Sequence, residues 1–489
     1  MHPIALPLSV LVAALPFLTG SGAQSLSESL SQSPTISAPS GSSTAGGGGG
    51  GQSGGAGSQT FQLQDYLTFL NSSGYTSLSR AIEQADQTQN GQEWIAQLSN
   101  GNWTVFAPTN DAFSSVSQDV SGNASTLADY LSYHYVYGDL HNVTASRDSG
   151  GSGQGTSSST SQAASAMVFP RQQGQGGGGQ NNLQLLSSIY PNDTIGRTAL
   201  SSPQFVRLEG DKNQVLGWTR NSPSDPVYIL NQMSQNGNTT VNNGTRWRNL
   251  AIFEVDGVFV PPGNLSTALS AVGDTPLVAF GDRVHISGPG GSNATAIQTL
   301  NQARGFTLFA PASRAFTSQV NQTLQSIQSD DQDDFRNAFQ NHYVNGSTVY
   351  SPTLREYAAN STTGDDDNWP RLISAAGEPF IFQSNDTGLY VRVSDDATAR
   401  IVRSDILVEN GVVHLVDGAL ISTDDSDDTA SSAFASASSA AAQTSTDTRV
   451  IIFPTPTGGV ARGSPTGSVT GTAISATPSS FRIRRALKV

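Results

Sequence analysis

The feature that most constrains this chain is an internal repeat of three short segments. The first landmark, TVFAPTNDAF at residues 104–113, matches TLFAPASRAF at 307–316 at six of ten positions. The second landmark, YHYVYG at 133–138, matches NHYVNG at 341–346. The third landmark, NLAIFEVDGVFV at 249–260, matches NGVVHLVDGALI at 410–421. Three landmarks that recur in the same order indicate one domain that is present twice.

Low-complexity segments rich in Ser and Gly set the boundaries of the two copies, because such segments bury too little apolar surface to repay the entropy of ordering. The first copy is longer between its second and third landmarks, and the stretch 147–182 accounts for most of the excess. We expect a signal peptide at 1–23, a disordered Ser/Gly linker at 24–59, a first domain at 60–263 with a low-complexity insertion at 147–182, a second domain at 264–422 and a disordered tail rich in Ser, Thr, Ala and Pro at 423–489.

The amino terminus predicts entry into the secretory pathway. Residues 4–18 form an apolar stretch of signal-peptide length, and Ser21 and Ala23 have the spacing of a cleavage site before Gln24. We expect no transmembrane helix, because no other stretch is long and apolar enough. Because the C-terminal segment FRIRRALKV is short and charged, we also expect no GPI signal.

Candidate N-glycosylation sites agree with a secretory route. Thirteen Asn-x-Ser/Thr sequons lie between residues 71 and 385, which suggests glycans on folded domains rather than on tails. The predicted sites are Asn71, Asn102, Asn123, Asn142, Asn192, Asn238, Asn243, Asn264, Asn293, Asn321, Asn345, Asn360 and Asn385.

Apolar periodicity predicts helices before the first landmark and strands around the third. Leu63, Tyr66, Leu67 and Leu70 are spaced as one helical face, and the same stripe recurs in 78–85. Strand-like runs follow at 389–393, 401–408 and 412–421. The Asn-Gly pair at 410–411 predicts a hairpin with a type I′ turn. Each first landmark is expected to turn from strand to helix, with Thr109 and Ser313 as helix N-caps in the two copies.

These landmarks resemble the fasciclin (FAS1) family, whose domains carry a first motif similar to TVFAPTNDAF, a central Tyr-His pair and a second motif similar to NGVVHVIDGVL. The resemblance covers roughly residues 60–263 and 268–422, and the composition is similar to that of fungal fasciclin proteins. It implies an α+β fold: two tandem domains, each a small antiparallel β-wedge packed with helices, joined to disordered Ser/Gly/Thr-rich segments. The two copies differ at landmark positions, with Ser313 and Arg314 for Asn110 and Asp111, Asn341 for Tyr133 and His414 for Phe253.

Five residues are candidate contacts with a ligand or partner. His134 and His342 each end an amphipathic helical pattern near its buried stripe, which favours a structural, hydrogen-bonded histidine. In animal relatives the Tyr-His region is implicated in receptor binding, so the resemblance implies a contact role for Tyr133, His134 and His342. Asp405 and Ile406, followed by Leu407, look like an element through which some animal relatives engage integrins; the alternative for Ile406 is a place in the core.

Composition and missing motifs argue against several other functions. The net charge of −14 disfavours nucleic-acid binding, and the chain has no cysteine for disulfides, thiolate sites or nucleophilic catalysis. No His-Glu-x-x-His or Walker motif occurs, and the acidic clusters lack the EF-hand pattern. We therefore expect no enzymatic activity, cofactor or metal site.

The preferred hypothesis is a secreted glycoprotein that mediates cell adhesion or interaction with the cell wall or extracellular matrix. Its expected partners are cell-surface or wall glycans, glycoproteins or further copies of itself. The alternative is a small-molecule-binding or enzymatic protein of the secretory or vacuolar pathway. An extracellular location is expected; the signal peptide and sequons are equally compatible with a vacuolar one.

Overall fold

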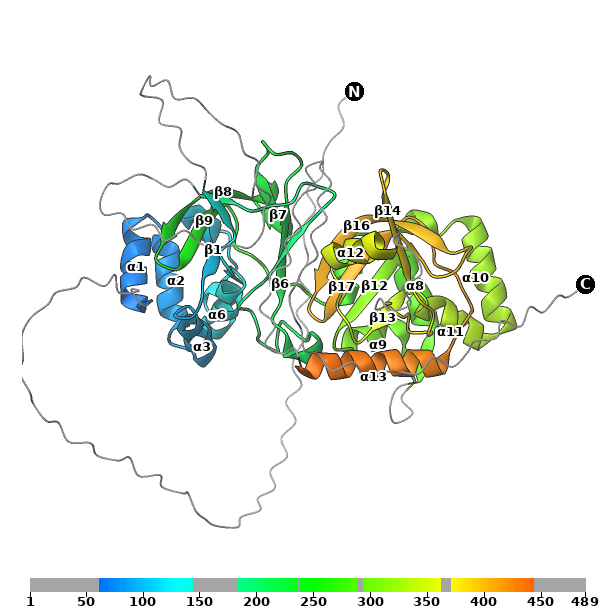
Figure 1. Cartoon of the computed structure of the whole chain (residues 1–489). Coiled ribbons are helices and arrows are strands. Elements are labelled where there is room, and N and C mark those ends of the chain that lie inside the picture. Colours follow the sequence, from blue (N-terminus) through cyan, green and yellow to red (C-terminus); the bar gives the residue numbers. More distant parts are fainter. Residues whose placement is uncertain are drawn as a thin grey trace, which may run out of the picture. The chain divides into compact units, whose positions relative to one another are not determined.

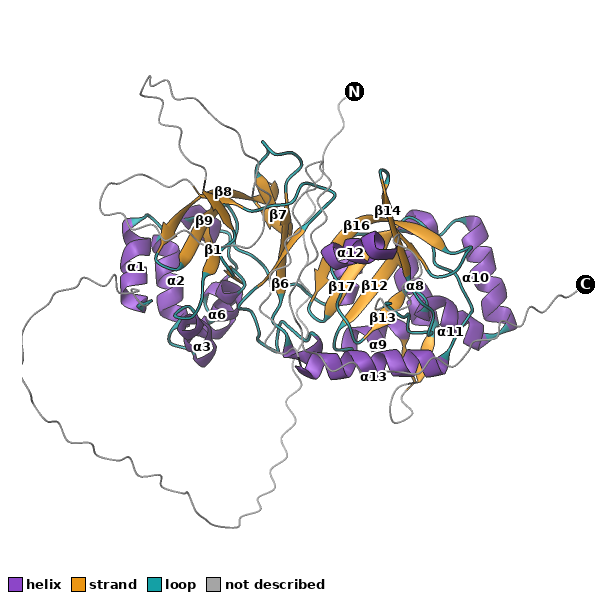
Figure 2. Cartoon of the chain, viewed as in Figure 1, coloured by secondary structure: helices purple, strands orange, loops and turns teal. Residues whose placement is uncertain are grey.

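The computed structural model describes residues 61–143, 183–235, 237–273, 275–287, 293–361 and 371–443. The predicted signal peptide, the linker and the insertion at 147–182 lie outside these residues. The described parts of the two copies belong to one compact unit. In Figures 1 and 2 both copies combine helices and strands, so the predicted α+β class and the duplication are confirmed.

The first copy begins with three helices that precede the first strand; the two apolar stripes predict α1 and α2, whereas α3 was not predicted. The faces of α1 and α2 bury the predicted residues, including Leu70 and Ile82. Its sheet has the strand order β2-β1-β9-β8-β7-β6-β5, with β3 and β4 attached at β8. The elements are α1 Leu63–Ser72, α2 Thr76–Ala85, α3 Gln89–Gln97, β1 Trp103–Pro108, α4 Asn110–Phe113, α5 Gln118–Ser121, α6 Ala124–Ser132, β2 Tyr135–Tyr137, β3 His141–Val143, β4 Leu183–Leu185, β5 Thr194–Arg197, η1 Glu209–Asp211, β6 Val215–Thr219, β7 Val227–Ser234, β8 Gly237–Trp247 and β9 Leu250–Val255.

The second copy repeats this plan with a shorter sheet, in the order β13-β12-β17-β16-β15-β14, and a separate β10-β11 pair. The predicted strand runs correspond to β15, β16 and β17. The elements are α7 Leu265–Ala271, α8 Thr275–Arg283, β10 His285–Ser287, β11 Asn293–Thr295, α9 Ala296–Gln302, β12 Phe306–Pro311, η2 Ser313–Ala315, α10 Ser318–Asp330, α11 Gln332–Gln340, β13 Tyr343–Asn345, α12 Ser351–Ser361, β14 Ile381–Asn385, β15 Gly388–Arg392, β16 Thr398–Val408, β17 Gly411–Val416 and α13 Asp427–Gln443.

The sheets differ from the predicted antiparallel wedge in one respect. The strand of the first landmark pairs in parallel with the strand of the third landmark, β1 with β9 and β12 with β17. Long crossovers containing helices separate these strands in sequence, and parallel neighbours require such connections. Phe106 pairs with Phe253 and Phe309 pairs with His414, so the residues aligned by the repeat occupy the same register in both copies.

The first landmark feeds a core on each face of its sheet. Val105 and Ala107 belong to the cluster that contains α1, α2, α3 and α6, whereas Phe106 belongs to the opposite cluster with Trp218. In the second copy Leu308 joins the cluster built on α7 to α11, whereas Phe309 joins the one under α12. Successive strand residues point to opposite faces, so a landmark strand that is buried at every position lies in a sheet that is covered on both sides. Figure 1 shows α1, α2, α3 and α6 beside β1 and β9.

The two predicted helix caps have different outcomes. Thr109 caps α4, with its hydroxyl accepting the Ala112 N–H at 3.1 Å, as predicted. The prediction for Ser313 is wrong, because its hydroxyl donates to the Gly273 carbonyl and a short 3₁₀ turn, η2, replaces the helix. The next helix of that copy, α10, is capped by Thr317 instead.

The hairpin at the third landmark forms, but its turn differs from the predicted one. β16 and β17 are antiparallel, and Val408 pairs with Gly411, so the loop is Glu409–Asn410 rather than Asn410–Gly411. Neither Asn410 nor Gly411 is among the residues with positive φ, so the turn is not type I′. The need for glycine is steric, since a Cβ at 411 would lie 2.7 Å from the Phe306 carbonyl oxygen.

The predicted disordered tail at 423–489 is wrong for residues 427–443, which form the 17-residue helix α13. Alanine is the best helix former, and Asp427 and Asp428 lie in the first turn, where negative charge is favourable. The helix ends against the first copy: the Ala441 backbone lies so close to Gly210 that a Cβ there would be 2.3 Å from the Ala441 carbonyl oxygen. Docking therefore stabilises a segment whose composition resembles a linker.

We predict that Gly411→Ala destabilises the protein by about 1–3 kcal/mol, the usual cost of overpacking, because its Cβ would meet the backbone and ring of Phe306. Gly263→Ala is the matched control, since a Cβ there meets only Thr267 at 3.9 Å. Denaturant unfolding measures both variants. Equal stabilities for the two variants would show that the close approach of Phe306 does not require glycine at position 411.

Candidate functional site

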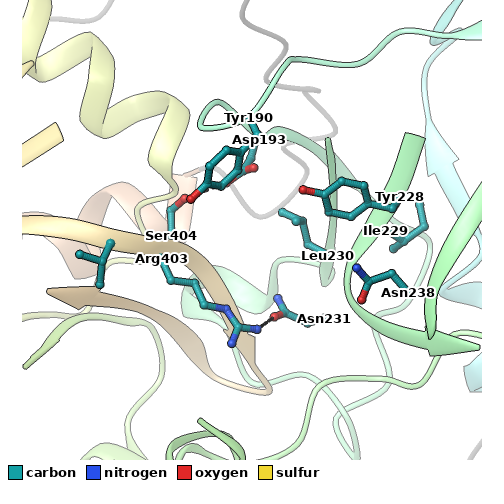
Figure 3. Close-up of a pocket in the computed structure, with 10 residues that line it drawn as sticks. Tyr190, Asp193, Tyr228, Ile229, Leu230, Asn231, Asn238, Arg403 and Ser404 are labelled. Atoms are coloured by element: carbon teal, nitrogen blue, oxygen red, sulfur yellow. Dashed lines mark hydrogen bonds between the residues drawn. The ribbon is translucent and has the colours of Figure 1, made fainter. Parts of the chain in front are cut away.

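A pocket of about 290 Å³ lies where β7 and β8 of the first copy meet β16 of the second. Figure 3 shows the Tyr190 and Tyr228 rings on one side of it and the Arg403 and Asn231 side chains on the other. Polar and ionisable side chains outnumber aliphatic ones in its wall, so the pocket is more polar than most small-ligand sites, which are lined mainly by apolar side chains. The lining residues are Tyr190, Asp193, Tyr228, Ile229, Leu230, Asn231, Asn238, Val402, Arg403 and Ser404.

Irregular strand pairing positions these side chains. The pairing of β7 with β8 shifts register between Tyr228 and Met233, and the pairing of β16 with β17 shifts on both sides of Arg403. A bulge interrupts the alternation of side chains along a strand and redirects some of them. Both walls of the pocket therefore come from strand segments whose side chains have left the regular pattern.

Asn231 joins the two walls. Its Oδ1 accepts from the Arg403 guanidinium at 2.5 Å, and its Nδ2 donates to the main-chain carbonyl of Asp405 at 2.9 Å. Asn231 and Asp405 have φ values of 58° and 55°, a left-handed conformation that few residues other than glycine adopt. Two such residues in direct contact indicate a backbone arrangement that the surrounding contacts hold in place.

Two carboxyl groups, one from each copy, lie together at the pocket: Asp193 lines it, and Asp405 lies behind Asp193. Asp193 is 5% exposed and Asp405 is fully buried. The Ser404 hydroxyl donates to Asp193 at 2.7 Å, and the Ser351 backbone N–H donates to Asp405 at 2.8 Å. The Arg355 guanidinium lies close enough to favour the charged form of both carboxyls.

Burial governs the protonation of this pair. Burial, and then the neighbouring Asp405 carboxyl, raise the pKa of Asp193 to about 8. Burial also raises the pKa of Asp405, but the hydrogen bonds from Ser351 oppose that shift. Because Asp405 accepts a backbone N–H, which cannot become an acceptor, we assign the proton at neutral pH to Asp193. Because ionisation of Asp193 would place two negative charges side by side, the contact between the copies is sensitive to pH.

The two candidate histidines are fully buried and tie the landmarks together. His134 Nε2 accepts the Phe259 N–H at 2.9 Å, so its Nδ1 carries the proton and donates to the Phe106 carbonyl at 2.9 Å. His342 Nε2 likewise accepts the Leu420 N–H at 2.9 Å, and its Nδ1 donates to the Ala338 carbonyl. Burial lowers the pKa of His134 to about 3 and that of His342 to about 4, so both are neutral at physiological pH.

None of the five predicted contact residues reaches the surface. Tyr133, His134, His342 and Asp405 are fully buried, and Ile406 is 5% exposed within the core of the second copy. The Tyr133 hydroxyl donates to the Val215 carbonyl at 3.0 Å. The structural interpretation of the histidines and of Ile406 agrees with these positions. The contact role implied by the resemblance is not supported, because a partner cannot touch a side chain without exposed surface.

The predicted sequons lie mainly at accessible positions. Asn192 and Asn360 are half-buried, and the side chains of Asn142, Asn243 and Asn293 lie outside the described residues. The exposed sites are Asn71, Asn102, Asn123, Asn238, Asn264, Asn321, Asn345 and Asn385. Asn238 is special because it also lines the pocket.

Nothing in the described part of the chain gathers three His, Asp or Glu side chains as a metal site would require. Nor does any described helix have the length and apolar character needed to cross a bilayer. The pocket offers aromatic rings, amides, a guanidinium and a carboxyl, groups that can hold a polar organic ligand. Asp405, the partner of Asp193, has no exposed atom with which to act on such a ligand.

Sequence reasoning missed most of this site. The pocket residues of the first copy follow the low-complexity insertion, and no motif links Asp193 or Asn231 to Arg403, 172 residues beyond Asn231. Only Asp405 and Asn238 were singled out from the sequence, each for another reason. The clustering depends on contact between the copies, which no local pattern encodes.

Comparison with known proteins identifies the repeated unit. The model of the Fasciclin domain matches residues 73–171 and 291–422. A curated relative, a "Fasciclin-like arabinogalactan protein" of Arthroderma benhamiae, is 23% identical over 247 residues, which are half of this chain and half of that relative. The chain therefore matches only about half the length of this relative.

A solved FAS1 domain pair from the insect cell adhesion molecule Fasciclin I is also similar, at 12% identity. The match covers 70% of this chain and 96% of that structure, with a TM-score of 0.27.

We predict that Asp193→Asn changes the pH dependence of stability. An acid whose pKa is raised on folding keeps its proton in the native state between about pH 4 and 8, so it makes stability fall as pH rises across that window, by up to about 1.4 kcal/mol per pH unit. The amide cannot ionise. The variant should therefore gain stability relative to the natural chain between pH 5 and pH 8, as measured by urea unfolding.

The control for this measurement is Asp256→Asn, whose carboxylate accepts from the backbone and hydroxyl of Thr240 within the first copy. A constant difference between Asp193→Asn and the natural chain across this pH range would mean that Asp193 is ionised throughout.

Proposed function

Because this chain belongs to the fasciclin domain family through its two matched segments, we propose that it is a secreted glycoprotein that mediates cell adhesion or cell-wall and matrix interaction without catalysis. The observation that carries the proposal is that the landmark residues are buried and bond to one another. The polar groups of the second and third landmarks bond to one another inside each copy, as His134 does to Phe259 and His342 does to Leu420. Such residues build a rigid scaffold and leave no exposed catalytic set among them.

The contact between copies supports a role for the pair as one binding unit. Arg207 of the first copy donates to the Asn301 carbonyl at 2.9 Å and pairs with Glu409 of the second. Gln214, fully buried, donates to the Val408 carbonyl at 3.1 Å. Surfaces of both copies thus reach a partner together, without the entropy cost of ordering two independent modules. The exposed sequons support a glycoprotein, and the similarity to a fasciclin-like arabinogalactan protein supports a glycan-rich setting.

The pocket favours a second function, binding of a small polar molecule in the secretory or vacuolar pathway. Its aromatic rings and directional polar groups support this alternative. The two functions differ in their partners: adhesion requires a polymer or a second surface, whereas the alternative requires only a soluble ligand.

The location test is fractionation of cells that express the tagged full chain into medium, wall, membrane and cell interior, with and without glycosidase. We expect a mass shift that glycosidase removes, in the medium or wall fraction. Leu11→Arg, which interrupts the predicted signal sequence, is the matched control and should abolish the shift. Natural chain of unshifted mass inside the cell would contradict the proposal.

The adhesion test uses beads coated with the secreted protein. We expect them to cluster or to bind isolated wall glycans, whereas beads carrying heat-unfolded protein should not. Beads that stay single and bind no wall material would favour the small-molecule alternative.

A further inference from the structure

Asn238 places a predicted modification site at the wall of the pocket. It starts the sequon Asn238–Thr239–Thr240 in β8, directly after the β7–β8 hairpin, where it pairs with Met233. The residue is exposed and lines the pocket. In Figure 3 its amide points toward Leu230 and Asn231, into the space between the two walls. The first sugar linked to Asn238 Nδ2 would therefore begin inside the pocket.

The pocket has the chemistry that an N-linked sugar needs. A pyranose ring has an apolar C–H face and a rim of hydroxyl groups, and N-acetylglucosamine adds an amide and a methyl group. The Tyr190 and Tyr228 rings offer apolar faces, while Ser404 and Arg403 offer polar groups. The Arg403 guanidinium uses Nη2 for Asn231 and carries further N–H donors. At about 290 Å³ the pocket is at the small end of ligand sites, so it suits one or two sugar rings.

We propose that the pocket holds the first sugars of an N-linked glycan on Asn238, which then packs against both copies. The inference rests on the proposed function, because only passage through the secretory pathway supplies such a glycan. The covalent link favours this occupant over a free saccharide, since a tethered ligand is always at high effective concentration. The glycan would contact Arg403 and Ser404 of the second copy while attached to the first.

A packed glycan is shielded from enzymes, whereas a glycan on an open surface is not. The matched comparison site is Asn71 at the end of α1, which is exposed and is not among the residues that line the pocket. The experiment uses the full chain secreted by a eukaryotic host. The native protein is treated with an endoglycosidase that cuts between the two core N-acetylglucosamines, and glycopeptide mass spectrometry follows each site over time.

We expect cleavage at Asn238 to be at least ten-fold slower than at Asn71 in the native protein, and equal at the two sites after denaturation. Tyr228→Ala removes one pocket wall and should bring the native rate at Asn238 toward that at Asn71. Thr240→Ser keeps the sequon, so the site should stay modified and shielded. Equal native rates at Asn238 and Asn71 would overturn the proposal.

The glycan occupancy of the sequons distinguishes a failure of this inference from a failure of the proposed function. If Asn71 and other sequons carry glycan but Asn238 does not, the inference fails and the secretory route stands. If no sequon carries glycan in the natural chain, both fail together. If the glycan at Asn238 is equally shielded in the natural chain and in Tyr228→Ala, the pocket does not hold it and the inference also fails.

Discussion

The contact between the two copies is the constraint on which the rest of the structure depends. It joins the β16–β17 hairpin to the strands β5 and β6 of the first copy through a small apolar cluster of Ile195, Val215, Tyr350, Leu407 and Val412. Fully buried Gln214 and the Arg207–Glu409 pair surround this cluster. The pocket, the pairing of Asp193 with Asp405 and the docking of α13 on Gly210 all require this contact. Without this contact, carboxyl and amide groups such as Asp405 and Gln214 would lose hydrogen-bond partners, and any that stayed buried without a partner would be costly.

Within each copy, similar hydrogen bonds join the repeated landmarks to one another. Asn249 and Asn410 begin the two third landmarks, and each donates its amide to carbonyls just before the first-landmark strand, at Leu98 and Leu300 respectively. The Thr104 hydroxyl donates to the carbonyl of Gly138, which ends the second landmark, and the Thr307 hydroxyl donates to that of Ser347, which directly follows it. These bonds explain why the three landmarks recur in both copies, although most of the sequence between them differs. Residues that hold a fold together in this way are poor candidates for partner contacts, which accounts for the burial of Tyr133 and both histidines.

The sequence predicted much of the fold because the signals are local. Helix stripes at α1 and α2, the strand runs of β15 to β17 and the duplication all follow from periodicity and repetition. The predictions failed where contact between distant segments decides the structure. An Ala/Ser-rich stretch becomes α13 because it docks, Gly411 is set by the closeness of Phe306 and not by a turn type, and the pocket joins Asn231 to Arg403. No pattern in a single sequence reveals such contacts. For the same reason, the sequence could not show whether Asp405 belongs to an exposed contact motif or is buried.

The most direct test of this account is calorimetry of the full natural chain beside the double variant Arg207→Ala/Gln214→Ala, which removes side-chain bonds between the copies. Arg246→Ala, which removes a pair with Asp139 inside the first copy, is the control. The account predicts one cooperative transition for the natural chain and for the control, and two separate transitions for the double variant. Two independent transitions in the natural chain, unchanged in the double variant, would show that the copies fold and act separately.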